Sequence, residues 1–136
     1  MALLPLEIVS PDRLLLSREV EMAVIPASEG LIGVLPAHSP MIVLLAGGTI
    51  SIYEGGRATD QLFVSGGFAE ITPERCTVLA DEAVPVAELS RTDAERLLAE
   101  AEVAYEATDK HDLVAYDAAM ARVQSARARV AAAGSA

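Results

Sequence analysis

Apart from Gly134, glycine and proline are confined to the first 85 residues of this chain, and their distribution limits what the chain can fold into. Neither residue type occurs from Val86 to Ala133. Before Val86, turn signals recur at roughly 8–12-residue spacing, which is typical of an all-β sandwich. After it, Ala, Glu and Arg predominate, and these residues favour helix. We therefore expect an α+β chain, with an antiparallel β-sandwich over residues 1–87 and an antiparallel α-helical hairpin over residues 88–136.

The stretch from Gly30 to Gly48 shows how the expected strands are delimited. Gly30 and Gly33 suit a positive φ or a close chain approach, and Pro36 and Pro40 fix an extended corner. No helical pattern separates the strands, which excludes a βαβ architecture. Apolar patterns between turns predict strands over Leu6–Val9, Glu19–Pro26, Leu31–Leu35, Met41–Leu45, Thr49–Tyr53, Gln61–Ser65, Phe68–Thr72 and Cys76–Ala80. The segment Arg13–Leu16 is apolar on both sides.

Two helices are expected in the remaining segment, over Ser90–Thr108 and Leu113–Ala132. Ser90 and Asp93 have the spacing of a capping box. The spacing of Ala94, Leu98, Ala101 and Tyr105 predicts one apolar stripe on the first helix. The second helix is expected to place six residues on one seam: Leu113, Tyr116, Met120, Val123, Arg127 and Val130. Five of them suit an apolar seam, and the charged Arg127 does not.

The hairpin should have little core of its own, because many of its inward positions are alanine and alanine buries little area. Two such helices alone would be marginally stable. We therefore expect the hairpin either to dock on the sandwich or to detach and lie along a partner.

The charge of the chain excludes two classes of partner. Twenty acidic and ten basic residues give a net charge of −10, whereas nucleic acid and anionic membrane both require a positive face. A basic protein surface is a better match. The N-terminus lacks the basic region of a signal peptide, and no apolar run reaches the ~18 residues of a membrane span. We expect a soluble, intracellular chain whose single cysteine, Cys76, is a buried small hydrophobe.

Residues for catalysis or metal binding are not apparent. None of the three Gly-Gly pairs is followed by Lys-Ser/Thr, and the sole lysine, Lys110, lies in the expected hairpin loop, so no Walker-type phosphate site is predicted. His38 and His111 are far apart and have no metal-ligand spacing. We predict no catalytic residue, no metal and no required cofactor. An enzyme with a site at His38 is an alternative, and so is a histidine that only bonds to the backbone of its own corner.

Three segments, in order, carry a resemblance to a known family. They are Gly30–Pro40 (GLIGVLPAHSP), Phe63–Glu70 (FVSGGFAE) and Val78–Ala83 (VLADEA), and a helical tail of the right length follows them. The chain resembles the epsilon subunit of the rotary F-type ATP synthase, which is called delta in mitochondria. The resemblance covers nearly the whole chain. It implies about ten strands, a count that the pattern of the residues does not reach.

The resemblance also implies a function and a set of partners. It implies a non-catalytic rotor subunit of the central stalk that couples gamma to the ring of membrane c subunits during ATP synthesis. It further implies possible contact of the C-terminal helices with the alpha/beta catalytic head. The location would be the cytoplasmic face of the bacterial inner membrane, with no direct insertion. An outward sheet face should then carry apolar side chains, because a partner covers it.

The loop that would contact gamma or the c-ring contains Glu29, Leu31 and His38. Many relatives carry an acidic residue after the first glycine, positioned to meet a basic loop of the ring. Leu31 occupies that position here, which puts a charged contact there in doubt. Apolar contact through Leu31 or a charge supplied by Glu29 would then replace the charged contact.

Regulation by the hairpin is the last implication of the resemblance. Some bacterial relatives bind ATP through an I/L-D-x-x-R-A motif on the first helix and arginines on the second. Asp93, Arg96 and Arg129 match this pattern, and its other positions differ. Asp93 and Arg96 also have structural explanations, as a capping acid and as one half of an i,i+3 or i,i+4 ion pair.

A second regulatory role is inhibition of ATP hydrolysis by the second helix, through contacts of Arg122, Arg127 and Arg129 with the catalytic head. Arg127 can instead simply extend from the edge of the seam to water. A stand-alone nucleotide-sensing module is the alternative function from a different class.

Overall fold

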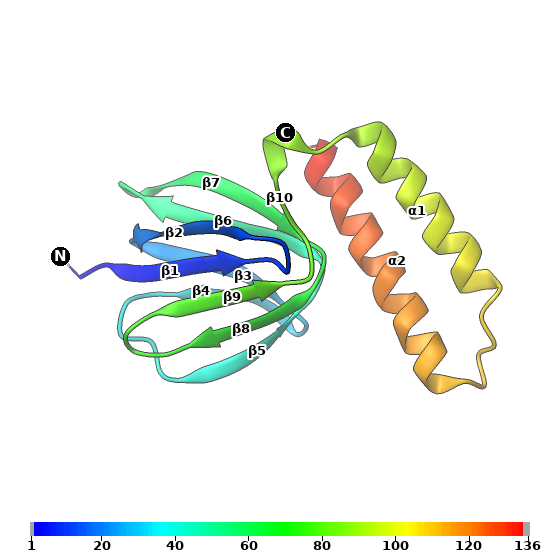
Figure 1. Cartoon of the computed structure of the whole chain (residues 1–136), viewed down its shortest axis with the longest axis horizontal. Helices are drawn as coiled ribbons and strands as arrows, with labels where there is room; N and C mark the ends of the chain where they lie inside the picture. The colour runs from blue at the N-terminus through cyan, green and yellow to red at the C-terminus, as the bar shows by residue number, and fades with distance from the viewer. Residues whose placement is uncertain (1, 135–136) are drawn as a thin grey trace.

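The computed structural model describes residues 2–134 and consists of a β-sandwich followed by two helices (Figure 1). The strands are β1 (Leu4–Val9), β2 (Leu14–Val20), β3 (Met22–Ala27), β4 (Gly30–Val34), β5 (Met41–Leu45), β6 (Gly48–Glu54), β7 (Arg57–Val64), β8 (Gly67–Ile71), β9 (Cys76–Ala80) and β10 (Ala83–Pro85). A 3₁₀ turn, η1 (Val86–Glu88), leads into α1 (Arg91–Glu106) and α2 (Leu113–Gly134).

The expected α+β architecture is confirmed, and so is the count of ten strands. Each strand predicted from the residues is present within a few positions, and the apolar segment Arg13–Leu16 falls largely in β2. The residues did not indicate β10, because it is only three residues long and ends in Pro85. Proline lacks the N–H that a strand ladder uses, so it argues against a strand in sequence analysis.

The strands form two layers that share one hydrogen-bonded path. One layer contains β10, β7, β6 and β3, with β4 on the outer side of β3, and the other contains β5, β8, β9, β1 and β2. The layers meet where Ala27 of β3 pairs with Leu45 of β5. All pairings are antiparallel except that of β1 with β9. The core between the layers is aliphatic, as the shortage of aromatic residues predicts.

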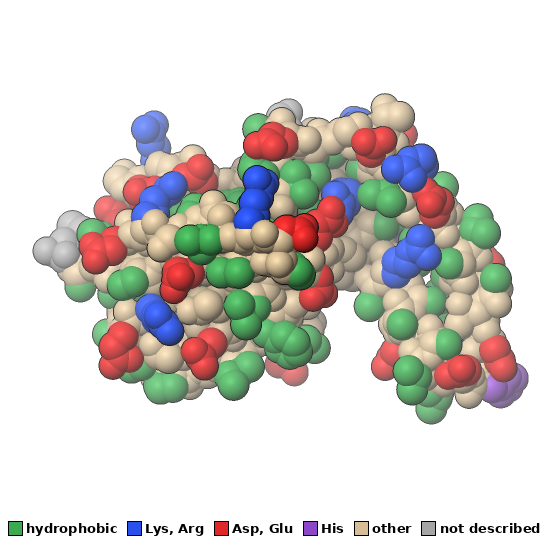
Figure 2. Space-filling model, in the orientation of Figure 1, with side chains coloured by type: hydrophobic (Ala, Val, Ile, Leu, Met, Phe, Trp, Pro, Cys, Tyr) green, Lys and Arg blue, Asp and Glu red, His purple; other side chains and the backbone are tan. Residues whose placement is uncertain are grey.

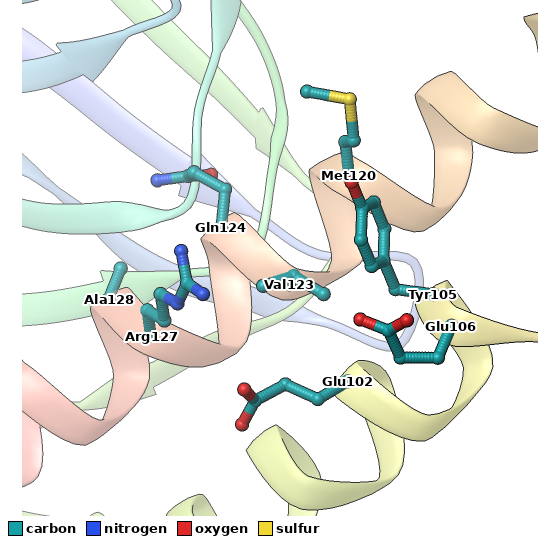
Figure 3. A pocket seen from close by; sticks show the side chains of 8 residues that line it. All are labelled: Glu102, Tyr105, Glu106, Met120, Val123, Gln124, Arg127 and Ala128. Atoms are coloured by element: carbon teal, nitrogen blue, oxygen red, sulfur yellow. The ribbon is translucent and has the colours of Figure 1, made fainter. Parts of the chain in front are cut away.

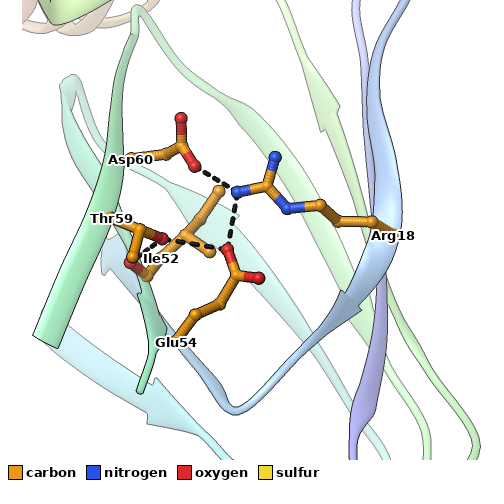
Figure 4. A network of polar contacts seen from close by, with 5 residues as sticks. All are labelled: Arg18, Ile52, Glu54, Thr59 and Asp60. Carbon is orange, nitrogen blue, oxygen red and sulfur yellow. Dashed lines mark hydrogen bonds and ion pairs between the residues drawn. The ribbon is translucent and has the colours of Figure 1, made fainter. Parts of the chain in front are cut away.

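An ion-pair network joins the layers at the edge formed by β2 (Figure 4). Arg18 of β2 donates to Glu54 of β6 at 2.7 Å and also to Asp60 of β7. Thr59 donates to the same Glu54 oxygen at 2.9 Å. The hydrogen bond to Asp60 raises the pKa of Arg18, so the guanidinium stays charged. The network therefore covers the open edge of β2 with charged groups.

The helical hairpin begins and turns as predicted. The Ser90 side chain accepts a hydrogen bond from the Asp93 N–H at 3.2 Å, which caps α1. Residues 107–112 reverse the chain, and the Asp112 carboxylate accepts from the Ala115 N–H at 3.2 Å at the start of α2. Tyr105 and Tyr116 connect the two helices through their hydroxyl groups, 3.0 Å apart, and this bond raises the pKa of Tyr116.

The stripe predicted on α1 is confirmed, but the seam predicted on α2 is partly wrong. Ala101 is buried with Val123 and Ala126 of α2, and Leu98 and Tyr105 pack against this cluster. Leu113, in contrast, is 73% exposed and Met120 is 46% exposed. The reason is that α2 packs against α1 on one side and against the sandwich on another, so its buried positions do not follow one line.

Candidate functional site

The outward face of the layer β5–β8–β9–β1–β2 carries a row of apolar side chains in register. Leu44 pairs with Phe68, Phe68 with Leu79, Leu79 with Val9, and Val9 with Leu14. Directly paired residues project from the same face of a sheet. We call this set of five residues the apolar row. Its four Leu and Phe side chains are each slightly more than half exposed, and Figure 2 shows hydrophobic side chains across this face of the sandwich.

A polar row borders the apolar row on the same face. It comprises Glu70, Thr77, Glu7 and Ser17, with Ile42 at its end on β5. Glu7 forms an ion pair of 3.6 Å with Arg75. An apolar centre with a polar border is the composition of a protein–protein interface. The predicted apolar patch on an outward sheet face is thus present.

The contact-loop residues do not form one site. Glu29 and Leu31 lie at the β3–β4 turn and the start of β4, whereas His38 follows the other end of β4. Leu31 is 73% exposed, and with Glu29 it lines a cleft of about 450 Å³ beside β5. His38 bonds through Nδ1 to the Ser39 carbonyl at 2.7 Å, which supports the interpretation of a corner-holding histidine.

The hairpin is docked on the sandwich through a close contact at the β5–β6 turn. The Gln124 side chain accepts from the Gly47 N–H at 3.0 Å and donates to the Gly47 carbonyl at 2.7 Å. A methyl group at Gly47 would lie 2.5 Å from the Ser125 Cα, so this approach requires glycine. We call the three residues the docking contact. Sequence analysis assigns neither Gly47 nor Gln124 to this contact, because 77 residues separate them.

A second junction holds the C-terminal end of α2. Arg129 forms an ion pair with Glu82 of the β9–β10 turn, and its guanidinium lies 4.7 Å from the centre of the Phe63 ring. Phe63 is fully buried with Val86 and Ala132 beside it. Arg129 was predicted as an ATP-binding or inhibitory residue, and in the docked hairpin its side chain is engaged by the sandwich.

The residues proposed for ATP binding are separated in this conformation. Asp93 pairs with Arg96 at 3.9 Å, and Arg96 donates to Glu100 at 2.6 Å, all on α1. Arg129 instead lines a cleft of about 410 Å³ with Arg122, Ser65 and residues of both helices. Asp93 and Arg96 are not among the lining residues of that cleft.

The two remaining arginines of α2 lie in different surroundings, since Arg122 lines the same cleft as Arg129 and Arg127 lines another. Arg127 lines an open cleft of about 600 Å³ between the helices, opposite Glu102 and Glu106 of α1 (Figure 3). Met120 and Val123 form part of its apolar floor. No ion pair in the described range 2–134 includes Arg122 or Arg127.

Metal-binding side chains do not gather in the described part of the chain. In residues 2–134 no three His, Cys, Asp or Glu side chains lie close enough to hold a metal ion. Cys76 is fully buried in the sandwich core, where desolvation raises the pKa of its thiol to about 11. Neither described helix is both long and apolar enough to cross a bilayer.

Comparison with known proteins identifies relatives over almost the whole chain. The family model of the ATP synthase delta/epsilon chain β-sandwich domain matches residues 3–86. An ATP synthase epsilon chain of Granulibacter bethesdensis is 65% identical over 133 residues, which cover 98% of each chain. Another, from Gluconacetobacter diazotrophicus, is 48% identical over 94% of this chain and 91% of its own.

Solved structures with the same fold agree. A chain in the mitochondrial ATP synthase OSCP/F1/c-ring structure of Euglena gracilis superposes with a TM-score of 0.77 at 27% identity, over 97% of this chain and 82% of that chain. A chain in the central stalk/c-ring structure of Tetrahymena thermophila ATP synthase gives 0.64 at 12% identity, over 96% of both, and supports the fold alone. This chain therefore belongs to the ATP synthase epsilon-chain family.

Proposed function

We propose that this chain, as a non-catalytic rotor subunit of ATP synthase, binds gamma through the apolar row. The observation that carries this proposal is the register of Leu44, Phe68 and Leu79 across three adjacent strands. A monomeric protein rarely exposes such a contiguous apolar patch, so the patch indicates a protein partner. Binding would join the sandwich rigidly to the shaft. Rotation driven by proton flow would then turn gamma, this chain and the c-ring together.

A contact with the c-ring or with gamma is assigned to the end of the sandwich that carries Glu29 and Leu31. Leu31 would contribute apolar contact there, in place of the acidic residue that many relatives carry, and Glu29 would supply a charge. His38, at the other end of β4, would contact either the c-ring or gamma. The complex would hold the chain at the cytoplasmic face of the bacterial inner membrane, peripherally bound.

The proposal about gamma is tested with a charge placed in the apolar row. Phe68→Glu should abolish binding to an ATP synthase depleted of its epsilon chain, because the carboxylate would be desolvated at the interface. Glu70→Gln, one position outside the row, is the matched control. Full binding by Phe68→Glu, with the variant folded, would refute a role for this face.

We further propose that residues 88–136 are a regulatory domain and residues 1–87 the binding domain. Exposed Arg122 and Arg127 are available to the alpha/beta head, whereas Arg129 would first have to leave Glu82 and Phe63. A brake on hydrolysis therefore requires the hairpin to undock. ATP hydrolysis by a head depleted of epsilon should slow when the full chain is added and should not slow with a chain stopped after Ala87. Equal rates would leave this chain a coupling part only.

ATP as a weak regulatory ligand has one supporting observation. Arg122 and Arg129 line the same cleft with Ser65 and Ser125, which provides cationic and hydroxyl groups for phosphates. The ion pair of Arg129 with Glu82 opposes binding, because an anion would have to displace that carboxylate. Millimolar ATP should raise the thermal unfolding temperature of the chain, and Arg122→Gln should remove that shift. An unchanged temperature would exclude the nucleotide-sensing alternative.

A further inference from the structure

The strand β5 is paired along one edge over its whole length and along the other edge only at its end. Residues 41–45 pair with β8, but on the opposite side only Leu45 has a partner, Ala27 of β3. The Leu44 carbonyl accepts from the Ser28 N–H at 2.9 Å, and the chain then turns away into β4. The edge of β5 is therefore open from Met41 to Leu44.

The pairing pattern identifies the groups on that open edge. The N–H and C=O of one strand residue point to the same side, and successive residues alternate. Because the Leu44 carbonyl points to Ser28, the Leu44 N–H and both groups of Ile42 also point away from β8. Those of Val43 and Leu45 point toward β8. Three backbone groups thus face the cleft that Leu31 and Glu29 line.

The side chains around this edge do not protect it. Ile42 is 75% exposed and Leu31 is 73% exposed, and no charged residue occurs from Pro40 to Tyr53. Natural proteins usually cover a free strand edge with charges or another element. The edge of β2 has that protection, since Arg18 bonds there to Glu54 and Asp60 (Figure 4). An apolar edge, beside which Glu29 is the charged residue that lines the cleft, indicates a strand that is completed by another chain.

We propose that an extended segment of gamma adds as a further strand along the open edge of β5. The inference rests on the proposed function, because β5 also carries Leu44 of the apolar row and the same partner would cover both. The unpaired N–H and C=O groups lie in a line along the strand edge. An extended polypeptide can pair with all of them, whereas a helix or a small molecule cannot. The segment should be neutral or basic, since the net charge of −10 disfavours pairing with a second copy of this chain.

The primary test is amide hydrogen exchange of the full-length chain, free and assembled with the epsilon-depleted ATP synthase, resolved to single residues. The Ile42 and Leu44 amides should exchange quickly in the free chain and at least tenfold more slowly in the complex. The Val43 amide, which faces β8, should be protected in both. Unchanged exchange at Ile42 and Leu44 in a formed complex would overturn the inference and leave the proposed function standing.

A pair of variants separates the backbone from the side chain. Ile42→Pro removes the N–H that faces the open edge and leaves the bonds to β8, as proline does in edge strands. Ile42→Ala removes only the side chain. Ile42→Pro should bind the complex about tenfold more weakly than Ile42→Ala. Equal affinities would overturn the inference, as would Ile42 protection that appears in the free chain at high concentration. Failure of the native chain to bind would overturn both proposals.

Discussion

Different interactions hold the sandwich and the hairpin in place. The sandwich has a continuous aliphatic core that runs from Leu4 to Ala80. The hairpin has one small cluster, Ala101, Val123 and Ala126. What places it is a short set of polar and close-packed contacts at Gly47 and Glu82. The aliphatic core holds the sandwich in one structure. The contacts at Gly47 and Glu82 can be broken without unfolding the sandwich.

Core truncation should show the largest difference between the two regions. Ile25→Ala removes buried methyl groups from the sandwich core and should lower the free energy of unfolding by about 2–5 kcal/mol. Val123→Ala should cost about 1 kcal/mol, because Val123 borders an open cleft that water can fill. Urea denaturation followed by circular dichroism measures both. Equal losses would mean that the hairpin belongs to the same cooperative core.

The thiol of Cys76 gives a pH test of how well the sandwich excludes water. Its pKa is about 11 when folded, against 9.0 for an exposed thiol. The unfolded state therefore loses this proton first, and stability should fall as pH rises from 9 to about 11, by at most about 3 kcal/mol. Cys76→Ala removes this part of the pH dependence. Rapid labelling of Cys76 by a thiol reagent under native conditions would contradict a sealed core.

Gly47→Ala should release the hairpin without unfolding the sandwich. The added methyl group would collide with the backbone of Ser125, an overlap that costs about 1–3 kcal/mol. Gly33→Ala is the matched control, because a methyl group there would meet only Met22, at 3.8 Å. The measurement is the distance between spin labels on β6 and α2. An unchanged distance in Gly47→Ala would show that other contacts suffice to place the hairpin.

Gln124→Ala should have a smaller effect of the same kind. It removes both hydrogen bonds to Gly47, worth about 1–2 kcal/mol together, and leaves the close packing of Ser125 in place. The docked population should fall less than in Gly47→Ala, and amide exchange in the C-terminal half of α2 should accelerate. If Gln124→Ala undocks the hairpin more fully than Gly47→Ala, the hydrogen bonds outweigh the packing.

The features that sequence analysis recovered are local ones. Alternation and turn residues place most of the strands, and Ser90 caps α1 because a cap depends on residues three apart. Each missed contact joins distant parts of the chain. The bonds of Gln124 to Gly47 span 77 residues, that of Arg129 to Glu82 spans 47, and that of Arg18 to Asp60 spans 42. No spacing rule relates such residues, so the docked position of the hairpin could not be predicted.

The candidate site likewise has parts that could be predicted from the sequence and parts that could not. An apolar outward face was expected, but which residues align across strands depends on register, and register was not deduced. Glu29, Leu31 and His38 were grouped because they are near in sequence, although a five-residue strand separates Glu29 from His38. Arg129 was given two external roles because nothing in the sequence indicates Glu82 as its partner.

The parallel pairing of β1 with β9 sets the order in which the molecule can form. Leu6 pairs with Cys76 and Val9 with Leu79, so the first strand has to wait for the ninth to leave the ribosome. Closing such long loops is costly, and sandwiches rich in them fold in roughly milliseconds to seconds. Until β9 arrives, one edge of β1 is unpaired and prone to aggregation. The burden on chaperones therefore falls on nascent chains from which β9 has not yet emerged.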